Sequence, residues 1–217
     1  MPKLPRTPDI KKIEETPPEV VVLEKGSRIF RIYKRGGRGK SSWGGFRYYG
    51  PTGNRFDHHE SDEGNNSYVQ ARGILYGALG ESAIETCLAE VYQEKRFVDR
   101  EGNQPALGIF MLDRDVQLLD LTGQFPTRVG ASQAINTGTR SSARNWSKAF
   151  YKYYATVGKI EGLLYSSSMN GNEPCVALYE QAQTAIPDDP TFNRLLCDPD
   201  LEEILLPIAK KLGYEMG

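Results

Sequence analysis

A cluster of six basic side chains lies within and just after one aromatic, β-branched segment. The cluster comprises Arg28, Arg31, Lys34, Arg35, Arg38 and Lys40. Such a cluster is either a solvated loop or a site for an anion such as a phosphate group. Trp43, Tyr48 and Tyr49 follow closely, as in proteins that bind single strands, but the formal net charge of −1 argues against nucleic acid as a direct partner.

Other chemistries lack their residues in this sequence. No glycine-rich phosphate loop, dinucleotide fingerprint or serine nucleophile elbow is present. His58 and His59 are adjacent without a third ligand at helical spacing, so we interpret them as surface residues and expect no metal. Cys87, Cys175 and Cys197 are far from the spacing of a zinc site and are typical of reduced thiols.

One glutamate lies where a carboxylate could do chemistry. Ser82 and Glu85 have the spacing of a capping box, which predicts the start of a helix. The buried stripe of that helix should comprise Ile84, Cys87, Leu88 and Val91. Glu90 then falls about 60° from Cys87, on the border of the stripe, at about 100° per residue. A border carboxylate is either an edge ion-pair partner or a reactive group.

The elements that would position these residues alternate without a regular strand–helix–strand rhythm, so we predict an α+β fold. The predicted strands are 20–23, which is either a strand or a docking segment, and 27–33, 73–76, 107–112, 116–121, 162–165 and 175–179. The predicted helices are 82–91, 140–155 with one apolar face, and a last helix opened by Asp198. Between about 34 and 66 the chain is rich in glycine and irregular, which is more often functional than idle.

The 217 residues are enough for one domain. We expect a proline-rich arm over 1–26, a main domain over 27–185 and a C-terminal amphipathic helix over 186–217 that packs on it. No apolar stretch approaches the roughly 18–20 residues of a membrane span. The first residues do not have the pattern of a signal peptide. We therefore expect a cytoplasmic protein.

Five short segments, in order, resemble the RES domain family, which is named for its Arg, Glu and Ser. The segments are Phe30 to Tyr33, Gly53 to Asp57, Leu75 and Tyr76 with Ser82 to Val91, Arg144 to Trp146, and Gly162 to Ser167 leading to Cys175–Tyr179. The resemblance covers about residues 28–182, so 27–185 would be the catalytic domain. It implies mixed and antiparallel sheets with flanking helices, as in ADP-ribosyltransferases, and breakdown of NAD+ by the toxin of a toxin–antitoxin pair.

The resemblance also assigns roles to residues. Arg31, Glu90 and Ser167 would be the name-giving residues, although Ser166 and Ser168 stand beside the last. Glu90 would stabilise the cationic ribose, and Ser167 would bind the ribose or position the acceptor. Binding of NAD+ would involve Arg31, Arg55, Tyr76, Tyr33 and Ser167, with the guanidinium groups on the pyrophosphate and the Tyr76 ring against nicotinamide. NAD+ is then a substrate, and no cofactor is expected.

Several alternatives stay open at this point. The acceptor could be phosphate, water or a protein side chain, the last making an ADP-ribosyltransferase. A silent nucleotide-binding module is a rival from a different class. The expected partners are NAD+ and a helix-turn-helix antitoxin, and a second copy of the chain stays open. The arm could itself restrain the enzyme, with Glu14, Glu15 and Glu19 meeting Lys34, Arg35 and Arg38, or have no regulatory role.

Overall fold

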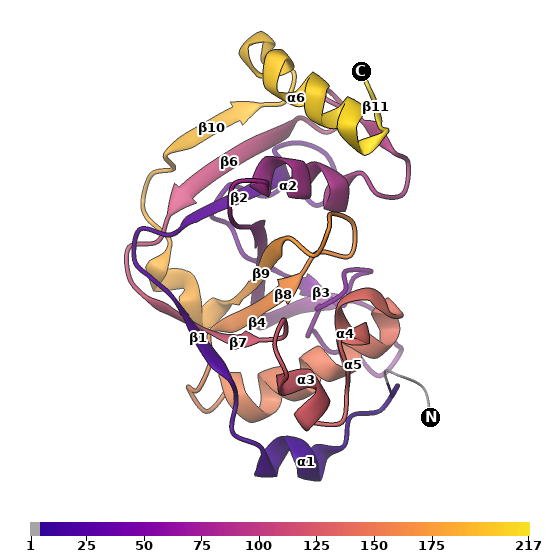
Figure 1. Cartoon of the computed structure of the whole chain (residues 1–217), viewed down its shortest axis with the longest axis vertical. Helices are drawn as coiled ribbons and strands as arrows, with labels where there is room; N and C mark the ends of the chain where they lie inside the picture. Colours follow the sequence, from indigo (N-terminus) through magenta and orange to yellow (C-terminus); the bar gives the residue numbers. More distant parts are fainter. Residues whose placement is uncertain (1–4) are drawn as a thin grey trace.

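The computed structural model describes residues 5–217, which build one large mixed sheet flanked by helices (Figure 1). The strands are β1 (Val20–Leu23), β2 (Arg28–Lys34), β3 (Arg47–Gly50), β4 (Tyr68–Ala78), β5 (Phe97–Val98), β6 (Pro105–Met111), β7 (Val116–Asp120), β8 (Gly162–Ser166), β9 (Pro174–Tyr179), β10 (Phe192–Leu195) and β11 (Glu215–Met216). The helices are α1 (Ile10–Glu15), α2 (Ala83–Val91), α3 (Phe125–Arg128), α4 (Ala134–Thr137), α5 (Arg140–Phe150), the π-helix η1 (Tyr151–Ala155), the 3₁₀ helix η2 (Glu180–Ala185) and α6 (Pro199–Leu212). The predicted α+β class is confirmed.

The large sheet has nine strands in the order β1-β7-β8-β9-β4-β2-β6-β10, with β3 on β4. Its pairs are antiparallel except β7 with β8. Strands β6 and β7 follow each other in the chain but lie in different parts of the sheet, β6 beside β2 and β7 beside β1 and β8. A small second sheet pairs β11 with β5.

The sheet is nearly divided between β2 and β4. These strands share one pair, Phe30 with Ala78, whereas β2 pairs with β6 along its whole length. Gly77 permits the close approach at this joint, since a Cβ there would lie 2.4 Å from the Ile29 Cγ2. Past the joint, the two strands separate and leave room between them.

Helix α2 covers this joint and lies beside α6 at one end of the molecule (Figure 1). The Cys87 thiol contacts the Phe30 carbonyl of β2 at 3.3 Å. The predicted capping box is wrong: Ser82 is the N-cap, but its side chain makes no cap hydrogen bond. Glu85 instead accepts from Lys211 of α6 at 2.7 Å. Val91 is also not buried, because it lies at the helix end beside the open space.

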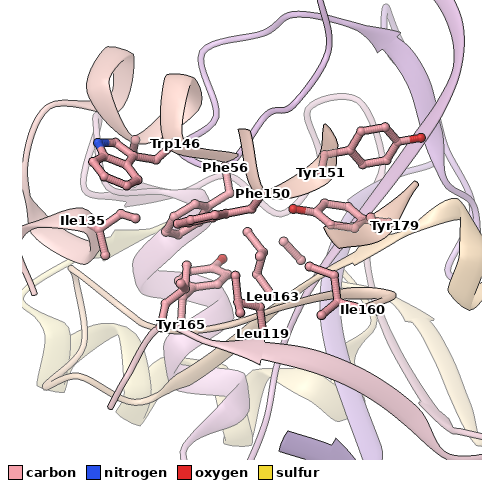
Figure 2. Close-up of a cluster of buried hydrophobic side chains, with 14 of the residues drawn as sticks. Phe56, Leu119, Ile135, Trp146, Phe150, Tyr151, Ile160, Leu163, Tyr165 and Tyr179 are labelled. Atoms are coloured by element: carbon pink, nitrogen blue, oxygen red, sulfur yellow. The ribbon is translucent and has the colours of Figure 1, made fainter. Parts of the chain in front are cut away.

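Helix α5 and the π-turn η1 supply one face of the main core, as the sequence predicts. Ala143, Trp146, Phe150 and Tyr154 are all buried. Figure 2 shows the rings of this cluster together, and Phe56 packs on Tyr165 of β8 with ring centroids 4.6 Å apart. Burying an aromatic side chain of this size contributes about 1.5–3 kcal/mol, so this face holds β8 and β9 firmly beneath α5.

The N-terminal arm packs on this core rather than on the basic cluster. Ile13 of α1 is fully buried, and the Tyr154 hydroxyl donates to its carbonyl at 2.7 Å. β1 pairs with β7 at the sheet edge far from β2. Glu19 pairs with Arg128 at 2.6 Å. Of the alternatives for the arm, contact with the basic cluster is therefore excluded for Glu19, and the arm lies against α5.

The C-terminal segment contributes a strand as well as the predicted helix. β10 pairs with β6 and forms the other edge of the sheet, which the sequence did not predict. Asp198 caps α6 as predicted, since its carboxylate accepts from the Asp200 N–H at 3.0 Å. No described helix combines the length and the apolar character needed to cross a membrane.

Candidate functional site

A small pocket opens where β2 and β4 separate, and α2 covers it. Its volume is about 70 Å³. The lining residues come from β2, β4, α2, β8 and β9 and are mostly apolar around one carboxylate: Arg31, Ile32, Tyr76, Gly77, Ala78, Thr86, Cys87, Glu90, Val91, Tyr165 and Cys175. Such a wall suits a flat organic ring better than a phosphate group.

Glu90 and Ser167 meet at this pocket, although 77 positions separate them in the sequence. The Ser167 hydroxyl donates to Glu90 Oε1 at 2.6 Å, a short charge-assisted hydrogen bond. Glu90 Oε2 accepts no hydrogen bond from the described residues and stays open to a ligand. A hydrogen bond therefore joins two of the three residues that the resemblance names, Glu90 and Ser167.

The turn after β8 fixes the Ser167 side chain. The backbone N–H groups of Met169 and Asn170 donate to its Oγ at 3.1 and 3.0 Å. The Asn170 amide in turn donates to Thr86 on α2 at 2.9 Å, one helical turn before Glu90. This network selects Ser167 from the three consecutive serines, because its hydroxyl is the one that joins the turn to Glu90.

Arg31 lines the pocket from β2, but part of its guanidinium is already engaged. Its Nη1 donates to the carbonyls of Trp43 and Gly45 at 3.2 and 3.1 Å. Its Nε is buried and has no hydrogen-bond partner among the described residues. Burial lowers the pKa of Arg31 to about 10, so the group is cationic at neutral pH. Arg31 thus holds the glycine-rich loop against β2 and lines the same pocket as Glu90.

Arg55 lies in the loop between β3 and β4, directly before the buried Phe56, and it is the second arginine of the predicted site. Its Nη1 donates to the carbonyl of Gly138, at the end of α4. Burial lowers the pKa of Arg55, whereas the nearby Glu90 carboxylate raises it and Arg140 lowers it further. Arg55, Arg140 and Glu90 therefore lie close enough to interact, and Arg140 also pairs with Glu94 at 3.6 Å.

The two tyrosines predicted to bind NAD+ are placed differently. Tyr76 lines the pocket, and its buried hydroxyl has no hydrogen-bond partner among the described residues. Burial raises the pKa of Tyr76 well above 10, and the Asp57 carboxylate adds to the rise. Tyr33 does not line the pocket, because its hydroxyl donates to Asn193 of β10 at 2.6 Å and accepts from Arg35 at 3.0 Å. It contacts the site only through Arg31, whose guanidinium lies 5.9 Å from the Tyr33 ring centre.

Sequence reasoning does not identify most of the pocket wall. It places Cys87 in the core, and Tyr165 and Cys175 enter only as part of the resemblance, yet all three line the pocket. Burial raises the pKa of the Cys87 thiol to about 12 and that of Cys175 higher still. Both thiols are therefore neutral, and they act as apolar wall rather than as nucleophiles. The alternation along 175–179 could have indicated that Cys175 faces the same side as Ala177.

The interpretation of His58 and His59 as surface residues is wrong, because both are fully buried. The His58 ring stacks on Tyr151 with centroids 4.2 Å apart, and His59 Nδ1 bonds Asp57 at 2.6 Å. Asp57 also pairs with Arg47 at 3.0 Å. Among the described residues, no group of three or more His, Cys, Asp or Glu side chains could hold a metal ion. This buried network supports the loop that carries Arg55.

Of the comparisons with known proteins, the one with solved structures found a similar fold. No family model matches the chain, and no curated protein sequence matches it. A chain in the crystal structure of the M. tuberculosis MbcT-MbcA toxin-antitoxin complex is similar, with a TM-score of 0.53 over 90% of this chain and 95% of that chain. The sequences are 16% identical, so the similarity shows a shared fold. This chain therefore has the fold of a chain from a toxin–antitoxin complex.

Proposed function

We propose that the protein is an enzyme that degrades NAD+ by cleaving the bond between nicotinamide and ribose, and that it is the toxin of a toxin–antitoxin pair. The hydrogen bond from Ser167 to Glu90, which lines the mostly apolar pocket, carries the proposal. The fold shared with a chain of a toxin–antitoxin complex supports the toxin role.

The chemistry needs one well-placed carboxylate. As the bond from C1′ to the nicotinamide nitrogen breaks, its electron pair leaves with the ring, which becomes a neutral molecule and needs no general acid. Positive charge then develops on the ribose, as in glycoside hydrolysis. Glu90 stabilises this charge through Oε2 while Ser167 holds Oε1, so the carboxylate does not have to reorganise during the reaction.

The remaining residues bind and orient the dinucleotide. The apolar wall of the pocket takes the nicotinamide ring, with the Tyr76 ring as one side. Arg31 and Arg55 attract the pyrophosphate. Because Arg31 Nη1 already binds two backbone carbonyls, its role is to order the loop and to supply charge, and Arg55 is the more available partner.

The reaction ends when an oxygen nucleophile bonds to C1′ and loses its proton. Water gives ADP-ribose, and phosphate gives ADP-ribose 1″-phosphate. We propose one of these two reactions as the activity, with transfer to a protein side chain as the alternative. A silent binding module has no need of a carboxylate held by a buried serine, so the Glu90–Ser167 pair favours an enzyme.

The test is to incubate purified protein with NAD+, with and without phosphate, and to identify the products by mass spectrometry. We expect free nicotinamide together with one of the two ADP-ribose products. A reaction with no loss of NAD+ under either condition would refute the proposed activity. Low-copy expression in a host should arrest growth and deplete NAD+, and coexpression of an antitoxin would relieve both effects.

A further inference from the structure

The end of α2 carries Glu90, and the main chain there needs hydrogen-bond donors from outside the helix. The last carbonyl groups of a helix have no partner within it, so side chains, turns or water must supply donors. The Ala89 carbonyl accepts from the Tyr214 hydroxyl at 3.3 Å. The carbonyl of Glu90 itself accepts from Gln93 Nε2 at 2.6 Å. Glu90 is therefore held at its main chain by Gln93 as well as at its carboxylate by Ser167.

The Gln93 amide is engaged at both of its ends. Its Nε2 donates to the Glu90 carbonyl, and its Oε1 accepts from Arg140 Nη2 at 2.6 Å. A guanidinium only donates and a carbonyl only accepts, so both partners require the same orientation of the amide. Arg140 and Gln93 thus form a continuous bridge, the Arg140–Gln93 bridge, from the start of α5 to the end of α2, across 47 positions of sequence.

Arg140 is the first residue of α5, where a positive charge does not stabilise the helix. The amino end of a helix carries partial positive charge and favours acidic side chains, and the first turn of α5 has none. Arg140 also lowers the pKa of the nearby Arg55, so these two cations repel each other. Its ion pair with Glu94 is 3.6 Å long, and the Glu94 side chain is 82% exposed, so this pair contributes little. The position of Arg140 is better explained by its short hydrogen bond to Gln93.

The Arg140–Gln93 bridge joins two parts of the molecule that the sheet connects weakly. Helix α2 contacts β2 and β4, whereas α5 belongs to the aromatic core that includes Tyr165 of β8. Because β2 and β4 share a single pair, side-chain contacts decide how the end of α2 lies relative to α5. Ser167, in the turn after β8, makes one such contact, and the bridge makes another. Two contacts from the same side therefore fix the position of Glu90.

We infer that Gln93 and Arg140 are positioning residues, which act on the reaction through Glu90 by fixing the end of α2 that carries it. Neither residue lines the pocket, so neither is a catalytic residue. A catalytic group that is displaced by about 1 Å can lose a large part of its effect, up to about a hundredfold in rate. This inference rests on the proposed function and adds the support of its carboxylate to it.

The test measures NAD+ cleavage by variants of the full chain. Gln93→Ala removes the bridge, and we expect kcat to fall roughly tenfold while KM stays within twofold. Gln93→Glu keeps an acceptor for Arg140 but loses the donor to the Glu90 carbonyl, so it should lose as much. Arg140→Ala should also lower kcat, and Arg140→Lys, which keeps a donor for Gln93, should restore most of it. Glu94→Gln is the matched control, because it removes the exposed partner of Arg140 and leaves the bridge, and it should keep wild-type kcat.

A second background shows whether Gln93 acts through the carboxylate of Glu90. In Glu90→Gln the charge is already absent, so adding Gln93→Ala should cost no further rate. An equal loss in both backgrounds would mean a general structural role and would overturn the inference. It would also be overturned if Gln93→Ala kept kcat within twofold of wild type, or if Gln93→Ala and Arg140→Ala raised KM at unchanged kcat.

Hydrogen exchange separates this inference from the proposed function, because it needs no substrate. The backbone amides of residues 88–92 should exchange about fivefold to tenfold faster in Gln93→Ala and in Arg140→Ala than in wild type, and Glu94→Gln should leave them unchanged. If wild type cleaves no NAD+, the proposed function fails and exchange alone decides. Faster exchange in the two bridge variants then supports the fixing of α2 by the bridge, and exchange equal to that of wild type refutes it.

Discussion

The substitution Glu90→Gln removes the one carboxylate of the pocket while keeping its shape. Ser167 can still donate to the amide oxygen in place of Oε1, so the turn after β8 should keep its conformation. The hydrogen bond becomes neutral, which should reduce the free energy of unfolding by about 1 kcal/mol. The fold should therefore survive, and any loss of activity would report the charge.

The expected loss of rate follows from the charge alone. A carboxylate about 4 Å from a unit positive charge contributes about 4 kcal/mol at an effective dielectric constant near 20. This is about a thousandfold in rate, and removal of one preorganised electrostatic contact typically costs about 10²–10³ in kcat. We expect kcat for NAD+ cleavage to fall by this factor, measured as nicotinamide release at saturating NAD+.

Glu85→Gln is the matched control, because Glu85 lies on the same helix and pairs with Lys211 away from the pocket. It should keep wild-type kcat and change stability by at most about 1 kcal/mol, as for a surface ion pair. Ser167→Ala should act through Glu90, so combining it with Glu90→Gln should cost little more than Glu90→Gln alone. Activity of Glu90→Gln within a few-fold of wild type, or a control that loses as much activity, would refute the role of Glu90.

Three further predictions concern binding and stability. Arg31→Lys keeps the charge but loses the planar fork, so NAD+ affinity measured by calorimetry should fall by about 1–3 kcal/mol, and unchanged affinity would remove Arg31 from the site. Acid should destabilise the fold, because burial lowers the pKa of His58 in the folded chain well below 6.5. The unfolded chain therefore binds the proton more tightly than the folded chain. The stability that is present above pH 6.5 is lost as the pH falls towards the pKa of His58 in the folded chain. Urea midpoints that are equal at pH 7 and pH 5 would contradict this. Ile13→Ala should reduce the free energy of unfolding, measured by thermal unfolding, by about 2–5 kcal/mol, because Ile13 of the N-terminal arm is buried in the core. NAD+ turnover should not rise. Faster turnover would indicate that the arm restrains the enzyme.

The local elements with clear periodicity could be predicted from the sequence. The stripe of α5 and the strands on either side of the turn at Asn170 are where the pattern places them. Glu90 was predicted at the border of a buried stripe, and it lies at the border between the core and the pocket. Periodicity is local, so it identifies which side of an element is buried but not which element covers it.

The parts that depend on distant contacts could not be predicted in this way. The capping box of Ser82 does not form, and Glu85 pairs instead with Lys211, which is 126 positions away in the sequence. His58 and His59 have the composition of a surface loop, yet Asp57, Arg47 and the tyrosine rings bury them. Polar residues can be buried wherever partners satisfy them, and the sequence does not indicate which partners meet.

The candidate site itself depends on backbone geometry more than on any one side chain. β2 and β4 share the single pair of Phe30 with Ala78, and Gly77 leaves no Cβ to hold them apart there. Beyond this joint, the residues that would continue the ladder, Arg31 and Ile32 opposite Gly77 and Tyr76, line the pocket instead. A break in a sheet exposes side chains from both strands to one space, and a helix across it adds a third wall. Because this joint depends on backbone geometry, the cleft tolerates changes in most side chains, and the chemistry then depends on the few polar residues that line it.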